Sequence, residues 1–218
     1  MKTSTTTRNR LAVAAAQLFY AEGITASGVD AIASHAGVSK PTLYSHYRSK
    51  SDLVAAALDS QHHVRRQGIE AYLDQRTDKS PEDRLLSVFD WLEDWSGQQG
   101  ARGCAFLNAA AELVDPHDEP ARQVIRKHKQ WWLSLLADLA RDAGATDPAR
   151  LADELLLLID GVNARVLVTG NTRTAALARR VARLLLWESR FPNGMISSSG
   201  DPSKFHLRHT DDCGESER

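Results

Sequence analysis

The segment from Gly23 to Leu53 constrains the fold of this chain more than any other stretch, because it reads as two short helices around a tight turn. Ser27 is expected to cap the first helix through its side-chain oxygen, and Gly37 to end that helix in a left-handed conformation. Ser39 is expected to cap the second helix, with Pro41 in its first turn, where a missing amide proton costs nothing. This pattern predicts a helix-turn-helix, whose second helix enters the DNA major groove with its N-terminal residues leading.

Further residues in and around this segment occur in an order typical of one protein family. They are Leu18, Phe19, Gly23, Ile32, Ala33, Ala36 to Ser39, Thr42 to Tyr44 and Ser49 to Leu53. The segment therefore resembles the DNA-binding end of the TetR family of transcriptional regulators. Outside it, the chain is similar to that family only in length and helical character.

The resemblance implies which side chains contact DNA. Lys40, Pro41, Thr42 and Ser45 match base-facing positions of the recognition helix. A lysine there can donate to guanine, and Pro41 and Thr42 can touch a thymine methyl group. Ser45 stands where some family members carry a bulky aromatic residue. The other expected DNA contacts, most of them to phosphates, are Ser27 with its helix N-terminus, Ser39, Tyr44, His46 and Lys50.

The charge distribution agrees with a nucleic-acid contact confined to one end of the chain. Residues 1–52 contain six Lys and Arg against three Asp and Glu, whereas the whole chain has 27 and 28. A basic end on an acidic body favours DNA as the partner of the N-terminal module. No apolar run is long enough for a signal peptide or a membrane span, which predicts a cytoplasmic protein without a membrane partner.

The cysteines and histidines predict neither a disulfide framework nor a metal centre. Cys104 and Cys213 are the two cysteines, and neither has metal-site spacing. His62 and His63 are adjacent, so on a helix their side chains diverge by about 100° and do not converge on one ion. We therefore expect no cofactor and no metal.

Apolar spacing along the chain predicts an all-α fold of about nine helices. Residues 1–53 are expected to form a three-helix helix-turn-helix DNA-binding domain, with residues 2–9 fraying. Residues 54–191 are expected to form a larger helical ligand-binding and dimerisation domain, and residues 192–218 a disordered tail. Beyond the helix-turn-helix, the predicted helices span 10–22, 51–73, 82–95, 119–143, 148–169 and 173–190, with a short apolar segment at 103–113.

The last two predicted helices carry more apolar surface than packing on one side requires. They are therefore expected to pair with their symmetry mates in a four-helix bundle, giving a homodimer that reads a palindromic operator. The alternative is that they pack only within one chain. The expected interface residues are Leu155, Ile159, Val162, Leu177, Val181 and Leu184.

All five tryptophans lie beyond residue 90, where bulky aromatics and a few polar groups can line a pocket between helices. The resemblance implies that this body binds a small-molecule inducer that weakens DNA binding, which makes a ligand-responsive repressor the expected function. The alternative is that the aromatic residues are plain core. The expected pocket residues are Trp91, Trp95, Phe106, Asn108, Glu112, His128 and Trp132.

Cys104 allows two other interpretations of the body. In the first, the chain is an electrophile- or redox-sensing regulator, although Arg102 is the only cation nearby in the sequence that would lower the thiol pKa. In the second, Cys104, Glu112 and His128 form a nucleophile, carboxylate and base of a helical enzyme. The sequence lacks any nucleophile elbow, metal signature or nucleotide loop, so we expect no enzyme. A purely structural helical adaptor would leave the polar face of the recognition helix unexplained.

Overall fold

The computed structural model describes residues 6–77, 79–98 and 100–191, and this part of the chain is all-helical, as predicted. It contains nine α-helices and one 3₁₀ turn. The helices are α1 (Thr7–Glu22), α2 (Val29–His35), α3 (Lys40–His46), α4 (Lys50–Asp74), α5 (Pro81–Gln98), α6 (Ala105–Glu112), α7 (Glu119–Asp142), α8 (Pro148–Thr169) and α9 (Thr174–Arg190), with η1 (Pro116–Asp118) before α7.

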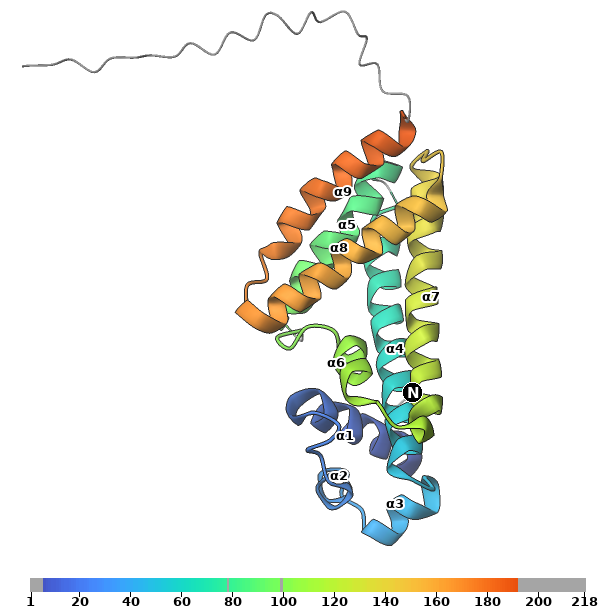
Figure 1. The fold of residues 1–218 in the computed structure, drawn as a ribbon, viewed down its shortest axis with the longest axis vertical. Coiled ribbons are helices and arrows are strands. Elements are labelled where there is room, and N and C mark those ends of the chain that lie inside the picture. The colour runs from blue at the N-terminus through green and yellow to red at the C-terminus, as the bar shows by residue number, and fades with distance from the viewer. Residues whose placement is uncertain (1–5, 78, 99, 192–218) are drawn as a thin grey trace, which may run out of the picture.

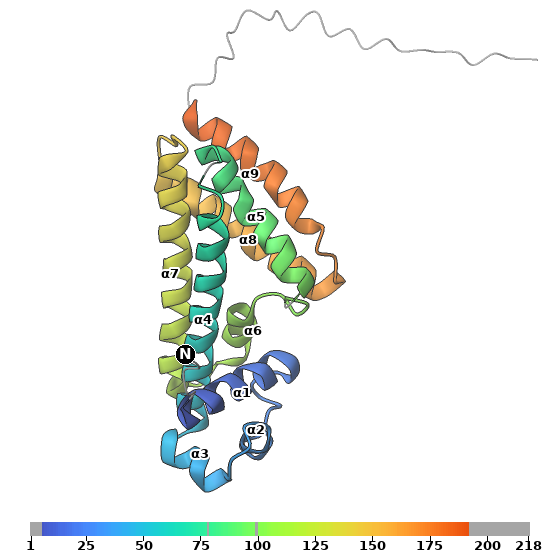
Figure 2. The same cartoon turned by 180° about the vertical axis from the view of Figure 1, so that it is seen from behind.

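The molecule is long, with helices α1, α2 and α3 at one end (Figure 1). Helices α4 and α7 run side by side from that end to the other, and α5, α8 and α9 gather at the far end (Figures 1 and 2). Helix α6 lies between the two groups, next to α1. The same arrangement seen from behind shows α4 leading from the N-terminal helices into the body (Figure 2).

Three apolar cores follow one another along the molecule, and α4 contributes to each of them. Leu53 and Ala57 belong to the core of α1–α3, and Leu58 belongs to a middle core beneath α6. Ile69 and Leu73 belong to the large core of the body. The predicted domain boundary after residue 53 therefore falls inside one continuous helix, which links the two ends mechanically.

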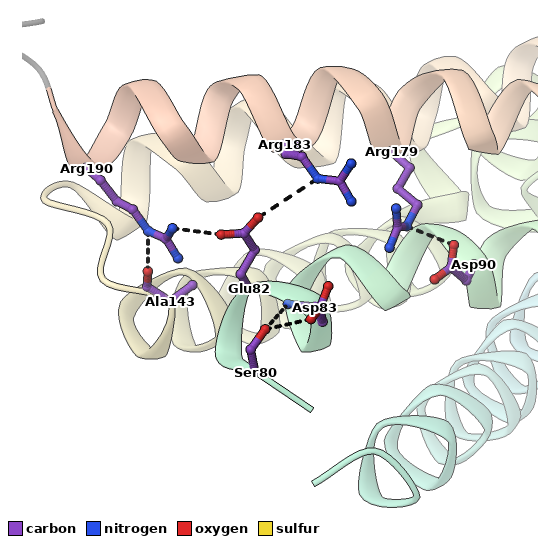
Figure 3. Close-up of polar contacts among 8 residues, drawn as sticks. All are labelled: Ser80, Glu82, Asp83, Asp90, Ala143, Arg179, Arg183 and Arg190. Carbon is purple, nitrogen blue, oxygen red and sulfur yellow. Dashed lines mark hydrogen bonds and ion pairs between the residues drawn. The ribbon is translucent and has the colours of Figure 1, made fainter. Parts of the chain in front are cut away.

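Ion pairs fix α9 onto α5 at the far end of the body (Figure 3). Arg179 approaches Asp90 at 3.0 Å, and Arg190 approaches Glu82 at 2.8 Å. Arg190 also donates from Nε to the carbonyl of Ala143 at 2.7 Å, which ties α9 to the end of α7. These contacts hold α9 by one side and leave its opposite side facing outward.

Several predicted boundaries differ from the structure. Helix α1 begins at Thr7, because the Thr6 hydroxyl accepts from the Asn9 amide at 3.3 Å and caps the helix. The prediction that residues 2–9 fray is therefore wrong for Thr7 onward. Helix α5 extends to Gln98 instead of ending at Trp95. The predicted disordered tail at 192–218, with Cys213, lies outside the described residues. Within the described ranges, no helix combines the length and apolar character needed to cross a bilayer.

Candidate nucleic-acid interface and ligand site

The turn between α2 and α3 has the local geometry that its residues predict. Gly37 has φ +66°, the left-handed conformation that glycine adopts without strain. Ser39 caps α3, with its hydroxyl accepting from the Thr42 amide at 3.3 Å, and Pro41 lies in the first turn. Leu43 is fully buried between α3 and the other two helices. The opposite side of α3 is left exposed at the end of the molecule.

Ser27 is the one residue of this motif whose predicted role is wrong. Its side chain is 0% exposed, and its hydroxyl donates to the carbonyl of Gly23 at 2.7 Å. The residue at the N-cap of α2 is Gly28, which has no side chain with which to cap. The Ser27 hydroxyl therefore closes the turn after α1 and is not available to a phosphate.

The C-terminal end of α3 is held by Arg8, from the first turn of α1. Arg8 donates to the carbonyl of His46 at 2.8 Å, and its guanidinium lies 4.6 Å from the ring centre of Tyr47. Tyr47 in turn donates its hydroxyl to the carbonyl of Arg8 at 2.9 Å. A cation at a helix C-terminus is favourable, so these contacts fix the orientation of α3 against α1.

The predicted base-facing side chains lie on the outer side of α3. Lys40 is exposed and pairs with Asp30 at 3.0 Å, a hydrogen bond that raises the pKa of its ammonium group. Pro41 is exposed, while the Thr42 hydroxyl lies 2.9 Å from that of Ser39. The Ser45 hydroxyl donates back to the carbonyl of Thr42 at 2.7 Å. Surface pairs of this kind are weak, so Lys40 can exchange Asp30 for a nucleic-acid partner.

The predicted phosphate-binding residues flank that face. Tyr44 is exposed and His46 is half-buried beside it. Lys50, at the start of α4, places its ammonium group 3.5 Å from the carbonyl of Thr25 in the turn before α2. The side chains that project from this end of the molecule are therefore polar, aromatic or basic.

Two predicted pocket residues, Asn108 and Glu112, lie apart from the tryptophans and line a cavity with residues of α1 and α4. Glu112 accepts from the Thr25 amide at 2.8 Å, and Asn108 donates to the carbonyl of Arg102 at 2.9 Å. Burial alone would raise the pKa of Glu112, but the amides of Thr25 and Ile24 outweigh it and lower that pKa. Glu112 is thus an anionic clamp between α6 and the turn before α2.

The segment before α6 adds a second clamp on α1. The Tyr20 hydroxyl donates to the carbonyl of Gly103 at 3.1 Å and accepts from the Arg102 amide at 2.9 Å. The Arg102 guanidinium also donates to the carbonyl of Ala21. These hydrogen bonds join the segment before α6 to the last turns of α1.

The other five predicted pocket residues form one aromatic cluster inside the body. Trp91 lies 5.5 Å from Trp95 and 6.2 Å from Trp132, measured between ring centres. His128 stacks on Phe106 at 3.6 Å and accepts a hydrogen bond from Trp132. Four of the five are buried and Trp95 is half-buried. The structure brings these residues together, and their role in ligand binding stays a prediction.

His128 is held in its neutral form. Its Nε2 accepts from the Trp132 indole at 3.2 Å, because an indole nitrogen can only donate. Its Nδ1 then carries the proton and donates to Nδ1 of His62 at 3.1 Å. Burial, with the nearby charge of Arg65 and the neighbouring His62, lowers the pKa of His128 from 6.5 to about 2.

This lowered pKa predicts a pH-dependent stability. Below pH ~6.5 the unfolded chain protonates His128 and the folded chain does not, so the free energy of unfolding falls as pH falls. Between pH 7.5 and 5.5 we expect His128 to remove about 1.4 kcal/mol in urea unfolding. In His128→Gln this loss should disappear, and in the exposed control His117→Gln it should remain. Equal pH dependence in both variants would contradict the assignment.

Arg65 is the residue of this cluster that the sequence analysis missed. Its side chain is 6% exposed, and its guanidinium carbon lies 4.0 Å from the ring centre of Trp95 and 5.6 Å from that of Trp91. Burial lowers the pKa of Arg65, and ionisation of Cys104 or Tyr20 would oppose that effect. Arg65 is thus a second cation near Cys104, besides Arg102.

The predicted dimer residues divide between two environments. Leu155, Ile159 and Val162 are buried in the core of their own chain, so their assignment to a dimer interface is wrong. The three on α9 are exposed, as an interface would require in a single chain. Other large apolar side chains lie exposed on the same two helices. The outward apolar residues of α8 and α9 are Leu157, Leu167, Val168, Leu177, Val181, Leu184 and Trp187.

Both ends of the molecule match known protein families. Residues 11–57 match the family described as bacterial regulatory proteins, tetR family, and residues 81–182 match the tetracyclin repressor-like C-terminal domain. A TetR-family transcriptional regulator from Streptomyces coelicolor is 30% identical, with a TM-score of 0.74 over 84% of this chain and 96% of that one. The chain belongs to the TetR family.

Two further TetR-type proteins are similar. A putative TetR transcriptional regulator from Streptomyces avermitilis is 32% identical, with a TM-score of 0.70 over 84% of this chain and 98% of that one. The HTH-type transcriptional activator FasR from Mycolicibacterium smegmatis is 40% identical over 90 residues. That match covers 39% of this chain and spans 40% of the length of FasR.

Membership of the TetR family makes this protein a transcriptional regulator, a class of protein that is not an enzyme. Two of the three residues considered for catalysis have other partners in the structure. Glu112 is bound to the Thr25 amide, and His128 is engaged by Trp132 and His62. Cys104 is buried at the start of α6. Its proposed redox role stays a prediction.

Proposed function

We propose that this TetR-family regulator is a repressor that binds a palindromic operator as a homodimer and leaves it when a small molecule binds in the body. The observation that carries the proposal is the outer face of α3, where Lys40, Pro41 and Tyr44 project from the end of the molecule. Lys40 and Thr42 supply base contacts, while Tyr44, His46 and the α3 N-terminus capped by Ser39 supply phosphate contacts.

One recognition helix reads too few base pairs to be specific, so the operator site must be doubled by symmetry. The outward apolar residues of α8 and α9 support a two-fold interface at this position, because large contiguous apolar patches on a soluble chain mark interaction sites. A symmetric pair would present two recognition helices to half-sites roughly 34–36 Å apart.

Ligand binding reaches α3 through α4, through the clamp of Glu112 on the turn before α2, and through the clamp of the segment before α6 on α1. Glu112 and Arg102 connect the middle of the molecule to the turn before α2 and to the end of α1. A ligand that prefers the conformer with shifted clamps changes the spacing of the two recognition helices. A tenfold loss of operator affinity requires about 1.4 kcal/mol of difference in ligand binding between the two conformers.

Operator binding can be tested with DNA fragments captured by the purified protein. On the captured operator, Lys50→Ala is expected to weaken cognate and scrambled duplexes similarly, and to lower the slope of log affinity against log salt by about 0.9. Thr42→Ala is expected to change the preferred base instead. Salt titrations followed by fluorescence anisotropy measure both effects.

Lys79→Ala is the matched control, because Lys79 is exposed beyond the far end of α4. It should leave both the affinity and the salt slope unchanged. If Lys50→Ala behaves like this control, Lys50 does not contact DNA. If the wild-type protein captures no fragment at low salt, the proposed function itself is wrong.

A further inference from the structure

The body contains one buried cation that stands out, Arg65 on α4. Within the described residues, no carboxylate lies within 4.0 Å of the Arg65 guanidinium, and Arg65 makes no hydrogen bond to that part of the chain. The guanidinium lies over the rings of Trp95 and Trp91 instead. A buried charge is costly unless it is paired, and cation–π contacts offset only part of that cost. An anion placed beside this guanidinium would therefore be favoured.

A buried donor without an acceptor lies on the ring that Arg65 covers. The indole Nε1 of Trp95 is buried and has no hydrogen-bond partner among the residues that the structure describes. The acceptors of the cluster are already used, since His128 receives the Trp132 indole and His62 receives His128. Both groups, the Arg65 guanidinium and the Trp95 indole, can only donate. The chemical complement of the pair is an acceptor that carries negative charge.

We propose that the effector of this regulator is a small organic carboxylate, whose acid group is bound by Arg65 and by the indole of Trp95. The proposal rests on the proposed function, in which the body binds an effector. One guanidinium neutralises one charge, so a monoanion fits better than a dianionic phosphate, which would leave a second charge uncompensated in a buried site. The surrounding rings of Trp91 and Trp132 favour an apolar or aromatic group behind the acid.

The segment before α6 couples this site to DNA binding. A Cβ atom on Gly100 would lie 3.1 Å from Cδ1 of Trp95, so the backbone of the segment packs directly on the indole. Three residues further on, Gly103 accepts the hydroxyl of Tyr20 on α1. In this proposal, a carboxylate bound beside Arg65 and the Trp95 indole presses on this backbone and displaces it. Its binding therefore loosens the clamp on α1 and shifts the recognition helix.

The test measures ligand binding without DNA, on the purified full-length protein. The probes are benzoate, phenylacetate, indole-3-acetate and hexanoate, with the corresponding amides as neutral controls and phenyl phosphate as a dianion. The carboxylates should raise the melting temperature and quench tryptophan fluorescence, and the amides should do neither. At least one carboxylate should bind at millimolar concentration or below.

Three variants assign the effect to the proposed groups. Arg65→Met keeps the volume and removes the charge, so it should abolish the carboxylate shift. Trp95→Phe keeps the ring and removes the donor, so it should weaken carboxylate binding about tenfold. Arg66→Met is the matched control, since Arg66 is exposed on the next position of α4 and pairs with Glu70. It should bind the probes as the wild type does.

Each outcome decides the proposal. No shift with any carboxylate, an equal shift with the amides, or an unchanged shift in Arg65→Met would overturn it. A larger shift with phenyl phosphate would overturn the assignment to a monoanion. If Arg65→Met does not fold, the carboxylate-induced shift in melting temperature is compared between Trp95→Phe and the control Arg66→Met instead. A shift as large in Trp95→Phe as in the control would then overturn the proposal. Operator binding by the ligand-free protein is measured separately, so failure of the carboxylate proposal leaves the proposed regulatory function standing.

Discussion

Replacing Leu184 with aspartate is expected to convert the protein to a monomer and to lower its affinity for a palindromic operator at least about a hundredfold. Leu184 is 66% exposed in the single chain, between Val181 and Trp187 on the outward side of α9. In a two-fold interface the same surface of each subunit contacts the other. One substitution in the chain therefore buries two carboxylates, one from each subunit, among apolar side chains. Sedimentation velocity and operator binding by anisotropy measure the two effects.

Val114→Asp is the control for this experiment. Val114 is exposed to a similar degree, but it follows α6, away from the outward side of α8 and α9. It should leave both the dimer and the operator affinity intact. The free energy of unfolding of the Leu184→Asp subunit should change little, because the side chain is already exposed in one chain. A Leu184→Asp protein that remains dimeric would place the interface elsewhere.

Replacing Gly103 with alanine is expected to destabilise the fold far more than the same change at Gly37. Both glycines have a left-handed backbone, with φ of +68° and +66°. At Gly37 an added Cβ meets no atom within 4 Å, so the cost is the conformational penalty of about 1–2 kcal/mol. At Gly103 the added Cβ would lie 2.4 Å from the carbonyl oxygen of Asn163, a backbone atom of α8.

Because neither backbone can move without disturbing a helix, we expect Gly103→Ala to cost at least about 2 kcal/mol more than Gly37→Ala. Urea unfolding of the two variants gives the difference directly, since the conformational penalty is shared. Gly103→Ala should also weaken operator binding, because the Gly103 carbonyl receives the Tyr20 hydroxyl on α1. Equal costs in the two variants would show that the segment before α6 adjusts without strain.

The helix-turn-helix could be predicted from the sequence because its signals are local. Gly37, Ser39 and Pro41 each act on a backbone within a few residues, and the structure shows each one in its expected place. Ser27 was mispredicted because a serine before a helix satisfies the capping pattern whether or not its hydroxyl is free. The competing carbonyl of Gly23 is supplied by the turn after α1, which the pattern does not describe.

The body was less predictable, because its contacts join distant segments. Glu112 was grouped with the aromatic residues by its position on α6, yet it reaches the Thr25 amide 87 residues away. Arg65 did carry a signal that was overlooked. It occupies an apolar-stripe position of α4, between Leu58 and Ile69, which are both buried. A basic residue at such a position points inward and needs a partner.

The predicted interface on α8 failed for a related reason. Leu155, Ile159 and Val162 form the main apolar stripe of α8, and this stripe is buried in the core of the same chain. The side available to a second subunit is the weaker stripe that includes Leu157 and Val168. Sequence periodicity finds both stripes, but it does not say which one the chain itself covers.

Because α4 contributes to three cores, the DNA-binding domain of this regulator cannot be exchanged at the start of α4. Ala57 belongs to the core of α1–α3 although it lies two turns inside α4. A recombination junction at the start of α4 would therefore separate the DNA-binding domain from side chains that complete its core. A transplanted domain must include the first two turns of α4, and the recipient protein must then accept foreign residues at Val54 and Leu58, beneath α6.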